Sequence, residues 1–203
     1  MPPRKRRAPT PPILAPSPPL PTPSLSSTSL RMSYRIARGE QGVLTFEPYK
    51  SLILPLWRFK TVSIAQQSSV ALKEVFDSYV ERGDFVGADM ARKFVQMGMT
   101  RAKRYANHAG GKKYGKSRVE GERGEELPKS EVHEGREEKL EASEVFKAVW
   151  RKCTGDDEYS RLKKEFQEEQ RMWDKARKGV TKEEDDVEVK QEPIVKEEES
   201  DGG

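Results

Sequence analysis

The fold of this chain is decided by residues 62–107, which read VSIAQQSSVALKEVFDSYVERGDFVGADMARKFVQMGMTRAKRYAN. In the first half of this stretch, apolar and small residues recur at intervals of three and four, as on one face of an α-helix. These residues are Val62, Ala65, Ser69, Leu72, Phe76 and Tyr79. Thr61 or Ser63 can cap the helix. The pattern therefore predicts a helix over residues 62–79.

A second helix is predicted from about Asp84 to Asn107, after a turn at residues 82–84. Its buried face is expected to contain Ala88, Ala91, Val95, Gly98, Ala102 and Tyr105. Gly98 would allow a neighbouring element to approach closely, because glycine has no side chain. Two helices with so short a connection form an antiparallel hairpin.

Other elements are expected on both sides of the hairpin. Residues 42–46 and 53–59 have strand-like apolar character, and Pro48 and Pro55 argue against a long helix there. Residues 110–136 have no periodicity and predict a flexible loop, and amphipathic helices should follow from Glu137 and after the break at residues 154–156. We therefore expect a mainly α fold: a helical hairpin with a short extended N-terminal segment and one or two covering helices.

Composition predicts one domain, residues 34–178, between two disordered tails. Hydrophobic residues make up 33% of the chain and charged residues 35%, so its whole length cannot form a packed core. Ten of the fourteen prolines fall in the first 23 residues, which predicts a Pro-rich basic tail over residues 1–33. Residues 179–203 are predicted to form an acidic tail.

Both tails contain patterns that suggest partners. The basic cluster Arg4, Lys5, Arg6 and Arg7 can bind a nuclear import receptor, so we expect a nuclear location. A mitochondrial presequence or a cytoplasmic location stays open, because no acidic residue precedes Glu40. In the acidic tail, Lys190 and Lys196 each follow a valine and precede a glutamate two positions later. That pattern resembles the consensus for attachment of a ubiquitin-like modifier.

Several classes of protein are excluded by residue counts. Cys153 is the one cysteine, and His108 and His133 are the only histidines, so we expect neither a disulfide framework nor a metal site. The sequence predicts no cofactor. No apolar run reaches the length of about 18 residues that spans a bilayer, and we expect no membrane segment.

The main functional hypothesis is binding of nucleic acid. Residues 90–119 contain nine Lys and Arg and no Asp or Glu. Such cations can neutralise phosphates, and nearby aromatic rings can stack on unpaired bases. We therefore expect a non-enzymatic, nuclear, nucleic-acid-associated protein, although a solvated helix face is the simpler interpretation. The candidate residues are Arg92, Lys93, Arg101, Lys103, Arg104, Tyr105, His108, Lys112, Lys113, Tyr114, Lys116 and Arg118.

Residues 110–117 also match the phosphate-binding pattern GxxxxGKS. That loop requires a buried strand before it and a helix after it. Here a basic helix precedes the match and a loop rich in Gly and Glu follows it. The context therefore argues against NTP hydrolysis.

Several stretches resemble the uncharacterised family called domain of unknown function 4385, found in phages, bacteria and fungi. They are residues 39–44, 47–51, 54–55, 57–61, 84–87, 89–94, 96–98, 105–108 and 110–111, with weaker similarity near 149–150 and 158–165. The resemblance covers roughly residues 34–166. It implies one fold unit and supplies no mechanism.

A second functional hypothesis is an enzyme or sensor for a small phosphorylated or carboxylated ligand. It requires the polar and aromatic residues of the family-like stretches to converge in one pocket, with His108 as general base. These residues are Trp57, Arg58, Lys60, Asp89, Arg92, Lys93, Tyr105, Asn107 and His108. The simpler interpretation is that Trp57 is core, Asp89 pairs with Lys93, and His108 closes a helix. A scaffold that recruits partners through its tails is the third hypothesis.

Overall fold

The structure is a computed structural model that describes residues 12–17, 19–115 and 124–188, with the side chains of the last helix described as far as Arg177. The chain divides into two compact units, residues 1–163 and 164–203. The first unit contains the predicted hairpin and the candidate site. The described part of the second unit continues the last helix.

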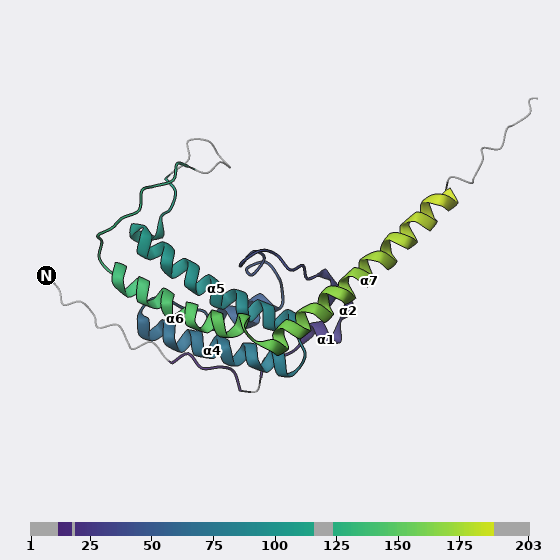
Figure 1. Ribbon diagram of the computed structural model, residues 1–203, viewed down its shortest axis with the longest axis horizontal. Coiled ribbons are helices and arrows are strands. Elements are labelled where there is room, and N and C mark those ends of the chain that lie inside the picture. Colours follow the sequence, from purple (N-terminus) through teal and green to yellow (C-terminus); the bar gives the residue numbers. More distant parts are fainter. Residues whose placement is uncertain (1–11, 18, 116–123, 189–203) are drawn as a thin grey trace, which may run out of the picture. The chain divides into compact units, whose positions relative to one another are not determined.

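Three helices form the centre of the first unit. They are α4 (Val62–Glu81), α5 (Phe85–Asn107) and α6 (Arg136–Thr154), which lie side by side (Figure 1). The Thr61 hydroxyl caps α4 by accepting from the Ile64 N–H at 3.2 Å. The Asp84 carboxylate caps α5 by accepting from the Gly87 N–H at 3.0 Å. The predicted mainly α fold and the helical hairpin are confirmed.

A glycine brings α5 and α6 close together. A Cβ at Gly98 would lie 2.6 Å from ring carbons of Phe146, a side chain that is completely buried on α6. The Ser143 hydroxyl next to this contact donates to the Met99 carbonyl on α5 at 3.0 Å. The close approach predicted at Gly98 is therefore confirmed, and α6 is the neighbour.

The packed part of the chain begins earlier than the sequence predicted. Two short helices form there, α1 (Pro23–Ser26) and α2 (Thr28–Ser33). The buried Ser24 hydroxyl donates to Asp84 Oδ1 at 2.7 Å, and Arg82 Nη1 donates to the Leu20 carbonyl at 2.6 Å. Prolines in this segment lack a donor but keep carbonyl acceptors, so side chains of the hairpin can hold it. The prediction of a disordered tail was wrong for residues 23–33.

Turns and short helices replace the predicted extended segment. Residues 38–48 form turns, followed by α3 (Tyr49–Ile53) and the 3₁₀-helix η1 (Leu54–Leu56). The Glu47 carboxylate accepts from the Ser51 N–H at 3.1 Å, which supports the first turn of α3. The extended conformation expected over residues 42–46 and 53–56 was therefore wrong, whereas Trp57 is extended.

The part of the region between α5 and α6 that the structure describes, residues 108–115 and 124–135, is irregular. It contains the 3₁₀-helix η2 (Ala109–Gly111) and one antiparallel bridge between Tyr114 and Glu126. The last helix, α7 (Asp157–Glu188), starts after the predicted break and continues beyond the expected boundary at residue 178. No helix in the described part of the chain has both the length and the apolar character needed to cross a membrane.

Cys153 is a core residue at the end of α6. Its side chain is completely buried, and burial raises the pKa of the thiol to about 12. Because the thiolate is the reactive species, we expect a thiol reagent at neutral pH to label Cys153 only when the domain unfolds. The measurement compares labelling rates in buffer and in denaturing urea. Equal rates would contradict the packing around Cys153.

Candidate functional site

The candidate site is built around Asp89, a fully buried residue in the second turn of α5. The helical repeat places two cations of the same helix beside its carboxylate. Arg92 Nε lies 2.8 Å from Asp89 Oδ1, and Lys93 Nζ lies 3.5 Å from Oδ2. One buried anion is therefore shared by two cations.

Two tyrosines from distant parts of the sequence complete this cluster. The Tyr34 hydroxyl donates to Asp89 Oδ2, and the Tyr159 hydroxyl donates to Oδ1 at 2.7 Å. Lys93 Nζ also donates to the Gln41 carbonyl at 3.2 Å and lies 4.9 Å from the centre of the Tyr34 ring. Both carboxylate oxygens are thus occupied by donors.

The protonation states follow from burial and from neighbouring charges. Burial favours a raised pKa for Asp89, but the charges of Arg92 and Lys93 and the two hydroxyl donors outweigh it, so the pKa lies below its ordinary value. The pKa values of Tyr34 and Tyr159 are raised, mainly because the two hydroxyls are buried and secondly because the negative charge of Asp89 lies beside them. Asp89 is therefore an anion, and both tyrosines keep their protons.

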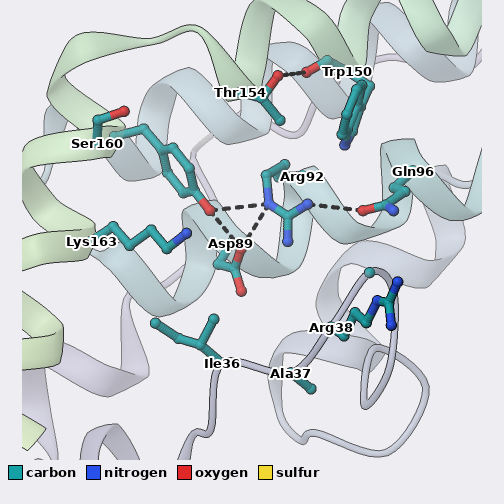
Figure 2. A pocket seen from close by; sticks show the side chains of 12 residues that line it. Ile36, Ala37, Arg38, Asp89, Arg92, Gln96, Trp150, Thr154, Ser160 and Lys163 are labelled. Atoms are coloured by element: carbon teal, nitrogen blue, oxygen red, sulfur yellow. Dashed lines mark hydrogen bonds and ion pairs between the residues drawn. The ribbon is translucent and has the colours of Figure 1, made fainter.

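Arg92 connects this cluster to an open pocket with a volume of about 480 Å³. Its Nε also donates to the Tyr159 hydroxyl at 3.0 Å, and its Nη1 donates to Gln96 Oε1 at 2.9 Å. Figure 2 shows Arg92 between Asp89 and Gln96, below Trp150. The pocket is lined by Ile36, Ala37, Arg38, Gly39, Asp89, Arg92, Gln96, Trp150, Thr154, Tyr159, Ser160 and Lys163.

The lining is rich in cations and hydrogen-bond donors. The lining contains three cations, Arg38, Arg92 and Lys163, but only one carboxylate, Asp89. Both oxygens of Asp89 already accept hydrogen bonds. Within the described residues, neither Arg38 nor Lys163 forms an ion pair, and Arg92 Nη2 makes no hydrogen bond. The buried Trp150 Nε1 also lacks a hydrogen-bond acceptor there. Such a lining can hold an anion with several acceptor oxygens.

The hypothesis of one convergent pocket is correct for only part of its residues. Asp89, Arg92 and Lys93 come together, and the pairing of Asp89 with Lys93 is confirmed. Of the nine residues, only Asp89 and Arg92 line the pocket. His108 lies at the opposite end of α5, where its backbone N–H closes the helix by donating to the Arg104 carbonyl at 3.0 Å. The pocket therefore does not contain the proposed general base.

The predicted nucleic-acid residues also separate into groups. Arg92 and Lys93 belong to the Asp89 cluster, and His108 is buried. Lys103 and Lys112 are exposed, whereas Lys113 pairs with Glu126 at 3.4 Å. Arg101, Arg104, Tyr105 and Tyr114 lie in the last turns of α5 and in the region after it. The remaining candidates, Lys116, Arg118, Arg4, Lys5, Arg6, Arg7, Lys190 and Lys196, lie outside the described residues.

The sequence did not indicate the other polar and aromatic side chains of the cluster and pocket, which are Tyr34, Arg38, Gln96, Trp150, Thr154, Tyr159, Ser160 and Lys163. The rings of Trp150 and Tyr159 fit the apolar periodicity of amphipathic helices, so the sequence alone indicates core residues at these positions. The weak family-like stretches around them were the available indication. Arg38 and Lys163 have no distinguishing pattern in a chain that is 35% charged.

The fold and the pocket define a small helical domain in which a buried aspartate orients an arginine toward an open cationic pocket. The sequence model described as domain of unknown function (DUF4385) matches residues 20–169. The chain belongs to this family, and the match includes residues of α1 and α2. No curated protein and no solved structure matches the chain.

Proposed function

We propose that the pocket binds a small anionic ligand. The observation that carries this proposal is the position of Arg92. Its guanidinium donates from Nε to Asp89 and Tyr159 and from Nη1 to Gln96, and it lines a pocket that also contains Arg38 and Lys163. An arginine oriented in advance loses little side-chain freedom when it binds an anion, which favours binding.

The lining favours a phosphate over a carboxylate. Donors are available from three cations, from the Trp150 N–H and from the Ser160 hydroxyl, whereas both Asp89 oxygens are already occupied. A carboxylate offers two oxygens, but a phosphate monoester offers three and more negative charge. The volume of about 480 Å³ leaves room for an organic group beyond the phosphate.

The same geometry favours binding over acid–base chemistry. Asp89 is ionised, but its oxygens accept bonds from Tyr34, Tyr159 and Arg92. The raised pKa of Tyr159 keeps that hydroxyl protonated. A group in such a network is a poor general base, because accepting a proton would break the interactions that orient Arg92.

Thermal unfolding of the full chain tests the proposal with phenyl phosphate, inorganic phosphate, benzoate and phenol as probes. A ligand present at about 100 times its Kd stabilises the folded state by about 2.7 kcal/mol, which raises Tm by several degrees. We expect a saturable rise with phenyl phosphate, a smaller rise with benzoate, and none with phenol.

Charge variants distinguish the pocket from nonspecific anion effects. Lys163→Gln removes a pocket cation without disturbing the Asp89 cluster, and Lys152→Gln removes an exposed cation of α6 outside the pocket. One hydrogen bond to a charged group contributes about 1.5–3 kcal/mol, so Lys163→Gln should weaken the binding of phenyl phosphate at least about tenfold. Lys152→Gln should bind normally. Equal affinities of the two variants for phenyl phosphate would contradict the proposal that this pocket binds the anion. The absence of a saturable rise in Tm with any anion would contradict it as well.

A further inference from the structure

A second surface lies at the other end of the three helices, where α4 and α6 begin and α5 ends (Figure 1). Three aromatic rings form a continuous series there, which we name the aromatic surface: Trp57, Phe59 and Tyr105. The ring centres of Trp57 and Phe59 lie 5.0 Å apart, and those of Phe59 and Tyr105 lie 5.6 Å apart. None of the three side chains is fully buried.

Cations from three different segments surround these rings. Arg101 of α5 lies 6.0 Å from the centre of the Trp57 ring, and Lys139 of α6 lies 5.6 Å from the centre of the Phe59 ring. Arg58 and Lys60 alternate with the rings along the chain, and both are exposed. The acidic side chain whose charge acts on Lys139 is Glu138.

We propose that the aromatic surface binds single-stranded nucleic acid. Partly exposed rings can stack on unpaired bases, and cations around them can neutralise the phosphates that follow those bases. Three further cations extend the positive charge at this end: Lys103 and Arg104 in the last turns of α5, and the exposed Lys112 just after the helix. Base pairs of a duplex are stacked on each other, so they cannot offer free faces to these rings.

This site is distinct from the anion pocket. Arg92 and Tyr105 are separated by thirteen positions on α5, which corresponds to about 20 Å along the helix axis. The two sites share no lining residue. Each proposal can therefore fail while the other stands.

Fluorescence anisotropy of the full chain, with labelled oligonucleotides of about twenty nucleotides, tests the proposal at about 50 and about 200 mM salt. The probes are oligothymidine, a duplex, and an abasic strand that has the same number of phosphates. We expect oligothymidine to bind about tenfold or more tightly than either of the others, because only its bases can stack on the rings. Equal binding of the thymidine and abasic strands, or tighter binding of the duplex, would overturn the proposal.

Matched double variants locate the surface on the protein. Arg58→Gln with Lys60→Gln removes two exposed cations beside the rings, and Arg151→Gln with Lys152→Gln removes two exposed cations at the far end of α6. The first pair should weaken oligothymidine binding about tenfold and make its salt slope shallower by about 1.4. The second pair should leave both quantities unchanged. The reverse result, or equal losses in both pairs, would contradict the location.

Replacement of a ring tests stacking directly. Trp57→Phe keeps an aromatic side chain but removes the indole, so the domain should stay folded. We expect oligothymidine to quench the tryptophan fluorescence of the wild type. In Trp57→Phe, most of this quenching should be absent. The same fractional quenching in both proteins would exclude stacking on Trp57.

Discussion

Asp89→Asn is expected to lower the free energy of unfolding by about 3–5 kcal/mol, which is the usual cost of breaking a buried ion pair from one side. The asparagine has nearly the same shape but no charge. Arg92 and Lys93, whose side chains are 11% and 1% exposed, would then lie in the interior without their anion. Two buried cations side by side repel each other and have lost contact with water, so the folded state becomes less stable.

Urea denaturation followed by circular dichroism measures this loss as a shift in the unfolding midpoint. Asp77→Asn is the matched control, because Asp77 also pairs with a lysine of its own helix, Lys73, at 2.5 Å. Its side chain is 42% exposed, so the control should lose no more than about 1 kcal/mol. Similar losses in the two variants would show that the Asp89 cluster is not a buried ionic network.

The pH dependence of stability gives a second measurement on Asp89. Its pKa in the folded state lies below the ordinary value, so the unfolded chain binds the proton more tightly. The stabilisation from the carboxylate is therefore complete above about pH 4 and is lost as the pH falls toward the folded-state pKa. The free energy of unfolding of the wild type should therefore fall as the pH is lowered through this range. It should fall less in Asp89→Asn, because the variant has no carboxylate to protonate at position 89.

The helical hairpin could be predicted because its determinants are local. The spacing of apolar residues along α4 sets the buried face, and the side chains of Thr61 and Asp84 act within three residues of their own positions. Gly98 was informative for the same reason, since a glycine inside an amphipathic helix indicates close packing. Identifying α6 as its partner required the tertiary structure.

The pocket could not be predicted because it depends on contacts between distant residues. Tyr34 and Tyr159 reach Asp89 across sequence separations of 55 and 70 residues. An aspartate on an exposed helix face can have a lysine or arginine three or four positions away, just as a buried aspartate can. The spacing of charges along the helix therefore does not show which aspartate is buried. The chemistry of Asp89 arises from its burial, which becomes visible only in the folded chain.

The N-terminal segment shows how composition can mislead. Proline disrupts the interior of helices and the central strands of sheets, and the sequence therefore predicted a disordered tail. The segment is instead held by its carbonyl oxygens, as when the Tyr79 hydroxyl donates to the Pro21 carbonyl at 3.2 Å. Composition measures what a segment can form alone, but not which side chains of the domain can bind it.

Phe146→Ala is the other substitution with a large expected effect, a loss of about 3–5 kcal/mol in the free energy of unfolding. The ring is completely buried and fills the space that Gly98 leaves between α5 and α6. Its removal loses apolar burial and leaves a cavity, because the two helices cannot fully close around it. Val70→Ala on α4 is the control, since Val70 is 54% exposed and should contribute little.

A second substitution, Gly98→Ala, tests whether this contact is as close as the structure shows. The test is whether it lowers or raises the free energy of unfolding. In the wild type, Gly98→Ala places a methyl group 2.6 Å from the Phe146 ring, and the resulting overpacking costs about 1–3 kcal/mol. In the Phe146→Ala background, the same methyl group enters vacant space and also gains about 1 kcal/mol of helix propensity. Gly98→Ala should therefore destabilise the wild type but stabilise the variant. Equal effects in both backgrounds would mean that residues 98 and 146 do not touch, because only residues in contact show such coupling.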